Sequence, residues 1–164
     1  MMKNVTRTIC LTLAVLLGST GTSWGADFQK GLAAAQSGDF ATALREWRPL
    51  AEDGHADAQY GLGVMYHKGQ GVLQDYKTAV RWYTLAAEQG DADAQYNLGG
   101  MFYKGQGVIQ DDVYAHMWFN IAAASGDKEA SKNRDIVAKE LTPTQIEKAE
   151  KLARQCVAKK YKGC

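Results

Sequence analysis

The sequence predicts an all-α protein built from stacked pairs of helices, and three observations support this prediction. Shifting the 164-residue chain by 36 positions aligns residues 55–90 with residues 91–126, and 20 of the 36 aligned positions are identical. Apolar residues recur at helical spacing within each unit, and glycine-containing loops separate the helical stretches. Repeats of this length are typical of arrays in which each unit packs on its neighbours.

The first 25 residues have the layout of a secretory signal peptide. Lys3 and Arg7 precede an apolar run over residues 9–17, and a small, polar segment follows it. The apolar run is about half as long as the ~20 residues that a membrane-spanning helix needs. We therefore expect cleavage before Ala26, a periplasmic or secreted mature chain and no stable membrane span after cleavage. An uncleaved anchor is the alternative.

Residues 26–54 predict the first pair of helices. One helix covers residues 27–36, and the turn at Ser37 and Gly38 joins it to a second helix over residues 39–53. The second helix matches the corresponding helix 36 positions later, where Asp39, Phe40, Ala43, Trp47 and Gly54 align with Asp75, Tyr76, Ala79, Tyr83 and Gly90.

The units 55–90 and 91–126 each predict two complete helices. Gly69 can adopt the left-handed conformation that ends the first helix, and Asp75 can cap the start of the second. Gly63 and Gly99 lie inside first helices, where glycine costs about 1 kcal/mol relative to alanine. Their presence indicates a close approach between helices. On the second helix, the expected buried face consists of Ala79, Trp82, Tyr83, Ala86 and Ala87.

Residues 127–164 predict a different, terminal pair. The glycine loop does not return, and the sequence predicts a polar helix over residues 128–141. Thr142, Pro143 and Gln145 then provide an N-cap, a first helical proline and a capping-box partner. An apolar face continues to Val157. An atypical, charged pair is the expected cap of a stacked array.

These motifs resemble the SEL-like (suppressor/enhancer-of-lin-like) repeat, a relative of the tetratricopeptide repeat. The pattern Ala-x-x-x-Leu-Gly-x-x-Tyr-x-x-Gly-x-Gly-Val-x-x-Asp, followed by Ala-x-x-Trp-Tyr-x-x-Ala-Ala-x-x-Gly, fits residues 55–90 throughout. In residues 91–126, Phe102 and Phe119 replace two of its aromatic residues. Residues 26–54 are more similar to a tetratricopeptide unit.

The resemblance implies an α/α superhelical solenoid of the exported bacterial type that acts as an adaptor or regulator of other proteins. Its first helices would line a concave groove for a protein or peptide. By analogy with tetratricopeptide packing, the residues facing that groove are Phe28, Leu32, Gln36, Asp57, Tyr60, Val64, His67, Lys68, Asp93, Tyr96, Gly100, Tyr103 and Lys104. Alternatively, Tyr60 and Tyr96 pack between repeats.

Cys156 and Cys164 remain after removal of the predicted signal peptide. Eight residues of unbroken helix rise about 12 Å, which exceeds the ~7 Å Cα separation that a disulfide allows. A bond between them therefore requires the last helix to end first, and Gly163 offers flexibility there. Their spacing also resembles cysteine-rich members of the same family. Two free thiols, or a bond to another chain, are the alternatives.

The sequence contains only weak matches to catalytic, phosphate-binding or metal-binding motifs. Ser125 and Lys128 match the Ser-x-x-Lys pair of some penicillin-interacting enzymes, but the sequence contains no Ser-Asp-Asn or Lys-Thr-Gly partner. The glycine loops follow helices, unlike phosphate-binding loops, and the three histidines lack metal-site spacing. We expect no catalytic residue, no metal and no cofactor.

Charge is distributed unevenly along the chain. Residues 26–127 carry 7 basic and 13 acidic residues, a net charge of −6, whereas residues 128–164 carry 10 basic and 5 acidic residues, a net charge of +5. The near-neutral total argues against a nucleic-acid binder. The two regions are either solvated faces of unlike sign or include a basic tail that contacts an anionic surface.

The sequence thus predicts an exported, non-catalytic scaffold that binds another envelope or exported protein or peptide. Two alternatives remain: a cell-wall enzyme of the penicillin-interacting (β-lactamase-like) type, and a peptidoglycan-associated module.

Overall fold

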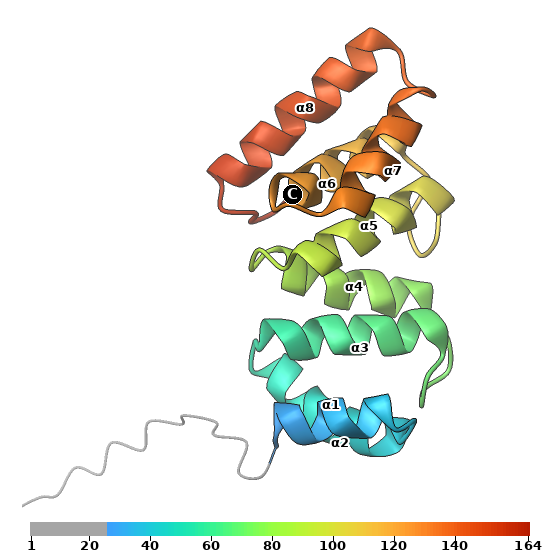
Figure 1. Cartoon of the computed structure of the whole chain (residues 1–164), viewed down its shortest axis with the longest axis vertical. Helices are drawn as coiled ribbons and strands as arrows, with labels where there is room; N and C mark the ends of the chain where they lie inside the picture. The colour runs from blue at the N-terminus through green and yellow to red at the C-terminus, as the bar shows by residue number, and fades with distance from the viewer. Residues whose placement is uncertain (1–25) are drawn as a thin grey trace, which may run out of the picture.

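The computed structural model describes residues 26–164, and within this range it contains eight helices and no strand (Figure 1). The helices are α1 (Phe28–Gln36), α2 (Phe40–Glu52), α3 (Ala56–Lys68), α4 (Tyr76–Ala87), α5 (Ala92–Lys104), α6 (Asp112–Ala124), α7 (Lys128–Ala138) and α8 (Pro143–Ala158). The predicted signal peptide lies outside the described residues.

The helices form an elongated stack (Figure 1). From α1 to α7, each helix packs against the next one in the chain, so that α1, α3 and α5 are the first helices of successive pairs. Helix α8 leaves this order and packs against α6. This arrangement confirms the prediction of an all-α solenoid of stacked helix pairs with an atypical C-terminal pair.

Local capping explains where most helices begin and end. Aspartate side chains accept backbone N–H bonds at the starts of α1, α2, α4, α5, α6 and α7, and Thr142 forms the predicted capping box with Gln145 at the start of α8. The cap of α3 was not predicted: the Nδ1 of His55 accepts from the N–H of Ala58 at 3.4 Å. Gly69 ends α3 in the left-handed conformation, with φ 68°.

Glycines inside helices allow aromatic rings of neighbouring helices to lie on the backbone. A Cβ added to Gly63 would lie 2.5 Å from Cδ1 of Tyr83, and one added to Gly99 would lie 2.7 Å from Cδ1 of Phe119. These glycines therefore permit close helix packing, as the sequence predicts.

Helix α6 is buried on nearly all sides because α5, α7 and α8 all contact it. His116 on this helix is only 4% exposed. Trp118 is also buried, packed in one cluster with residues of α8. Its counterpart Trp82, expected on the buried face of α4, is only half-buried.

Helix α7 ends at Ala138, three residues before the predicted end. The N–H groups of Lys139, Glu140 and Leu141 instead bond to carbonyl groups three residues earlier, at 3.1, 3.0 and 3.4 Å. These tight turns carry the chain into the extended backbone of Thr142, which starts α8.

None of the described helices is both long and apolar enough to cross a membrane.

Candidate functional site

Two hollows lie on the side of the stack formed by the first helices. The first hollow, of about 530 Å³, is lined by residues of α1, α2 and α3 and by the start of α5. The second hollow, of about 260 Å³, is lined by residues of α3, α5, α6 and α7, together with Gln106 from the loop after α5. The predicted groove residues are therefore divided between two sites, and we refer to both together as the groove.

The floor of the first hollow is apolar and aromatic. Phe28 and Trp47 stack with ring centroids 5.9 Å apart, and the indole Nε1 of Trp47 donates to the Phe28 carbonyl at 3.2 Å. Trp47 can lie this deep because glycines flank it: a Cβ on Gly31 or Gly61 would come within 2.5 or 2.8 Å of its ring. Leu32, Val64 and Met65 complete the apolar lining.

Three carboxylates border the same hollow. Asp57, Asp91 and Asp93 line it, and no Lys, Arg or His residue is among its lining residues within the described range. Burial raises the pKa of the Asp91 carboxyl, and the nearby charges of Asp93 and Asp57 raise it further. Burial, followed by the charges of Asp93 and Asp91, also raises the pKa of Tyr60. The first hollow therefore combines apolar surface with a negative potential.

The second hollow has the opposite electrostatic character. His67 and Lys104 line it, and no Asp or Glu lines it within the described range. Burial lowers the pKa of His67, and the positive charges of Lys104 and Lys68 lower it further. The ammonium groups of Lys104 and Lys68 therefore place positive charge near His67, whereas the Glu140 carboxylate lies at Tyr103.

Side chains of α7 close the second hollow. The Nδ2 of Asn133 donates to the hydroxyl oxygen of Tyr96 at 2.9 Å. The hydroxyl of Tyr103 donates to Glu140, just beyond α7, at 2.8 Å. Helix α7 and the turn after it therefore end the groove on this side.

Most of the predicted groove residues lie in one of the two hollows. Phe28, Leu32, Gln36, Asp57, Tyr60, Val64 and Asp93 line the first, and His67, Tyr96, Gly100, Tyr103 and Lys104 line the second. Lys68 is exposed and, within residues 26–164, lines neither of these two hollows.

Tyr60 and Tyr96 each line a hollow and pack against an aromatic residue of the same repeat. Each is half-buried and packs against an aromatic residue of the following helix: Tyr60 lies 5.9 Å from Tyr83, and Tyr96 lies 5.6 Å from Phe119, between ring centroids. Each also lines a hollow. Packing thus fixes the rings while leaving part of each at the groove surface.

Sequence reasoning missed lining residues that come from second helices or from loops. Trp47 and Phe40 of α2 and Phe119 of α6 reach the hollows between first helices. Asp91 was missed because it precedes α5 as its N-cap. Gly31 and Gly61, which leave space for the Trp47 ring, were the sequence features that could have indicated how deeply this ring is buried.

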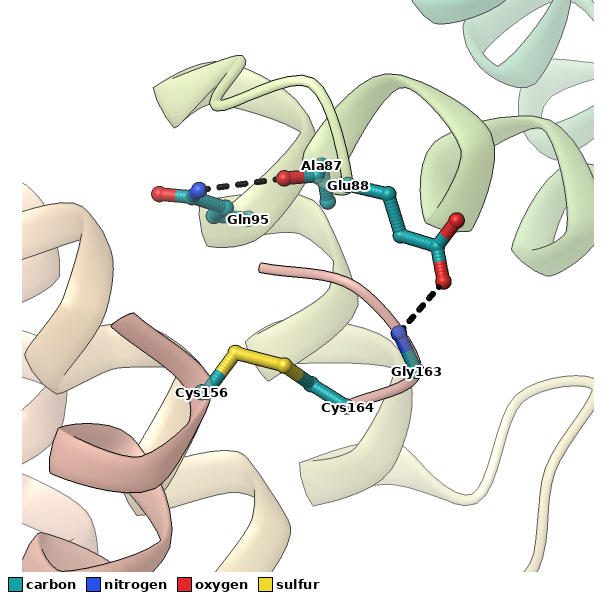
Figure 2. The surroundings of a disulfide bond; sticks show 6 residues. All are labelled: Ala87, Glu88, Gln95, Cys156, Gly163 and Cys164. Atoms are coloured by element: carbon teal, nitrogen blue, oxygen red, sulfur yellow. Dashed lines mark hydrogen bonds between the residues drawn. A yellow bond between two sulfur atoms is a disulfide. The ribbon is translucent and has the colours of Figure 1, made fainter. Parts of the chain in front are cut away.

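The C-terminal cysteines line neither hollow and are joined by a disulfide (Figure 2). Helix α8 ends at Ala158, which allows the Cα atoms to approach within 5.5 Å. The turn depends on Lys160 and Tyr161, with φ of 52° and 65°, in addition to the predicted Gly163.

The Ser-x-x-Lys pair lies at the junction of two helices. Ser125 is the exposed C-cap of α6, and Lys128 is the first residue of α7. Among the described residues, no group of three or more His, Cys, Asp or Glu side chains could hold a metal ion.

The model of the Sel1 repeat family matches residues 56–91 and 92–127, which contain α3 to α6. The chain contains two Sel1 repeats. The Sel1 fold typically serves as a protein-interaction scaffold.

Two solved structures support the assignment of these repeats. One is a protective antigen present in uropathogenic Escherichia coli strains and displaying an SLR fold; it has 34% sequence identity and a TM-score of 0.76 over 80% of this chain. The other, a Sel1 repeat protein from Oxalobacter formigenes, has 30% identity and a TM-score of 0.66 over 70% of this chain. Our chain spans 29% and 47% of their respective lengths. No curated protein matches its sequence.

Proposed function

We propose that this protein is an exported, non-catalytic scaffold that binds a segment of another protein in the groove. The observation that carries the proposal is the first hollow, where apolar and aromatic side chains remain open on the first-helix side of the stack. A hollow of about 530 Å³ can admit several side chains of an extended segment. Aromatic residues held in place by packing bind at low entropic cost.

Three observations support export. Residues 1–25 have the layout of a signal peptide, and disulfides such as Cys156–Cys164 are typical of oxidising compartments. One structural neighbour is described as a protective antigen. Intact-mass analysis of the protein from the producing bacterium tests this part: cleavage before Ala26 supports export, and a full-length cytoplasmic chain contradicts it.

Site-specific photo-crosslinking tests the groove. A benzoylphenylalanine placed at Val64 reports on the first hollow, and one placed at Leu85 reports on the outer side of α4, where Leu85 is 43% exposed. We expect a discrete crosslinked protein from Val64, and we expect it to decrease when Leu32→Glu introduces a charge into the hollow. Crosslinks from Leu85 alone, or crosslinks from Val64 that Leu32→Glu leaves unchanged, would contradict binding in the groove.

A further inference from the structure

The first hollow has a chemical asymmetry that restricts what can bind there. Its floor consists of Phe28, Leu32, Trp47, Val64 and Met65, whereas Asp57, Asp91 and Asp93 stand at its border. A purely apolar segment would cover these carboxylates without replacing their water, which is unfavourable. The occupant must therefore offer both an apolar side chain and a positive charge.

The three carboxylates have no cationic partner in the described structure. Ion pairs within residues 26–164 use Glu46, Glu129, Asp135 and Glu150 instead. Asp57 and Asp93 are exposed, and Asp91 accepts the N–H of Ala94 at 2.7 Å. The pKa of Asp91 is raised by burial and by its two acidic neighbours, which indicates that the charges repel one another.

We propose that the first hollow binds an extended protein segment in which a Lys or Arg side chain lies within two residues of a large apolar side chain. The inference rests on the proposed function, since it specifies the partner of the same groove. The apolar side chain packs against Leu32, Val64 and the Phe28–Trp47 pair. The cation lies among the three carboxylates and reduces their mutual repulsion.

The second hollow provides an internal contrast. The ammonium group of Lys104 lines it and would repel the same cation. A basic and apolar segment therefore occupies the first hollow, at the N-terminal end of the stack. Only neutral or acidic residues of the bound segment are expected to enter the second hollow.

The experiment selects twelve-residue peptides from a random phage-displayed library on the purified, oxidised protein. We expect selected peptides to place Lys or Arg within two positions of Leu, Phe, Trp or Met. Fluorescence anisotropy then compares a selected peptide with its Lys→Gln or Arg→Gln counterpart. We expect the dissociation constant to rise about tenfold, the combined effect of several partly solvated charge pairs.

Variants that lack selected carboxylates test which of them cause the preference for the basic peptide. The triple variant Asp57→Asn/Asp91→Asn/Asp93→Asn removes the three charges while Asn preserves the cap at position 91. In this variant, the basic peptide and its neutral counterpart should bind equally. The matched control Asp75→Asn/Asp111→Asn/Asp127→Asn removes three charges from other capping positions and should retain the tenfold difference.

Three outcomes would overturn the inference: selected peptides without a basic residue, equal charge preference in both triple variants, or no selected peptides at all. The crosslink from Val64 separates this failure from failure of the proposed function. If that crosslink persists in the Asp57/Asp91/Asp93 variant, the groove binds a partner, but the partner is not recognised through a basic residue.

Discussion

Gly163 donates its backbone N–H to the carboxylate of Glu88 at 2.9 Å, although 75 residues separate them in the sequence (Figure 2). The ring of Tyr161 lies close to Gly90 in the same turn, where an added Cβ would be 3.3 Å from the ring. The loop closed by the Cys156–Cys164 disulfide therefore packs onto the turn between α4 and α5.

We predict that reduction of this disulfide lowers the free energy of unfolding, because the unfolded chain gains conformational entropy. The decrease should be only about 2 kcal/mol, since the loop that the disulfide closes is short. Lys160 and Tyr161 have positive φ, a strained conformation for these residues, and are expected to leave it when the bond opens. Urea unfolding with and without reductant measures the change. Cys164→Ala should behave like the reduced protein and be insensitive to reductant, whereas equal midpoints for the oxidised and reduced protein would contradict the prediction.

Substitution by alanine should change the free energy of unfolding in opposite directions at two neighbouring glycines of α5, Gly99 and Gly100. Gly99→Ala places a Cβ 2.7 Å from the ring of Phe119, and this overpacking should lower the free energy of unfolding by about 1–3 kcal/mol. Gly100 has no atom within 4 Å of an added Cβ. Gly100→Ala should therefore raise the free energy of unfolding by about 0.5–1 kcal/mol through helix propensity.

Chemical denaturation of the two variants measures this difference. If both alanines stabilise the protein, the ring of Phe119 does not require the glycine. Phe119→Leu replaces the ring with a smaller aliphatic side chain and should reduce the penalty of Gly99→Ala, which attributes the penalty to this contact.

Gln89 hydrogen-bonds to a buried glutamine of its own repeat and to the backbone of the preceding unit. The side-chain Nε2 of Gln89 donates to Oε1 of Gln59 at 2.7 Å and to the carbonyl of Gly54 at 3.0 Å. In the next repeat, Ser125 stands in place of Gln89, and Oε1 of the buried Gln95 has no hydrogen-bond partner among the described residues. The two repeats thus differ in the hydrogen bonds that Gln89 donates.

We predict that Gln89→Ser lowers the free energy of unfolding by about 1–3 kcal/mol, because the buried Gln59 oxygen loses its donor. Ser125→Ala is the matched control and should change it by less than about 0.5 kcal/mol. Thermal and urea unfolding of both variants provide the comparison. Equal effects of the two substitutions would show that the Gln59–Gln89 bond adds nothing.

The sequence predicts what depends on near neighbours along the chain. Helix starts at Asp39, Asp75 and Thr142 follow from a cap and the residues just after it, so the pattern is sufficient. The packing glycines are also predictable because the repeat places them beside aromatic positions of the next helix. Periodicity and repeat alignment therefore account for the eight-helix stack.

The groove and the C-terminal loop depend on contacts that no local pattern specifies. The division into two hollows arises from side chains of second helices such as Trp47 and Phe119, and closure of the second hollow arises from α7. The contact of Gly163 with Glu88 joins residues that are 75 positions apart in the sequence. Likewise, the depth of His116 follows from α8 packing on α6 rather than continuing the stack.

The burial of His116 makes stability dependent on pH. Burial lowers its pKa, the positive charge of Arg134 lowers it further, and Glu150 and Asp135 oppose this shift. Burial also lowers the pKa of His67, with Lys104 and Lys68 acting in the same direction. The folded protein therefore binds these protons less readily than the unfolded chain, whose histidines titrate near pH 6.5.

The sign of the effect follows from proton linkage. Both histidines favour folding fully above the unfolded pKa, and this contribution decreases as the pH falls from about 7 toward the lowered pKa values of the folded state. We predict that the urea midpoint decreases between pH 7.5 and pH 5.5. His116→Leu should reduce that decrease and should also remove Nδ1, a buried atom without a hydrogen-bond partner among the described residues. Adding His67→Gln should reduce the decrease further, and an unchanged pH dependence in the double variant would attribute it to other groups.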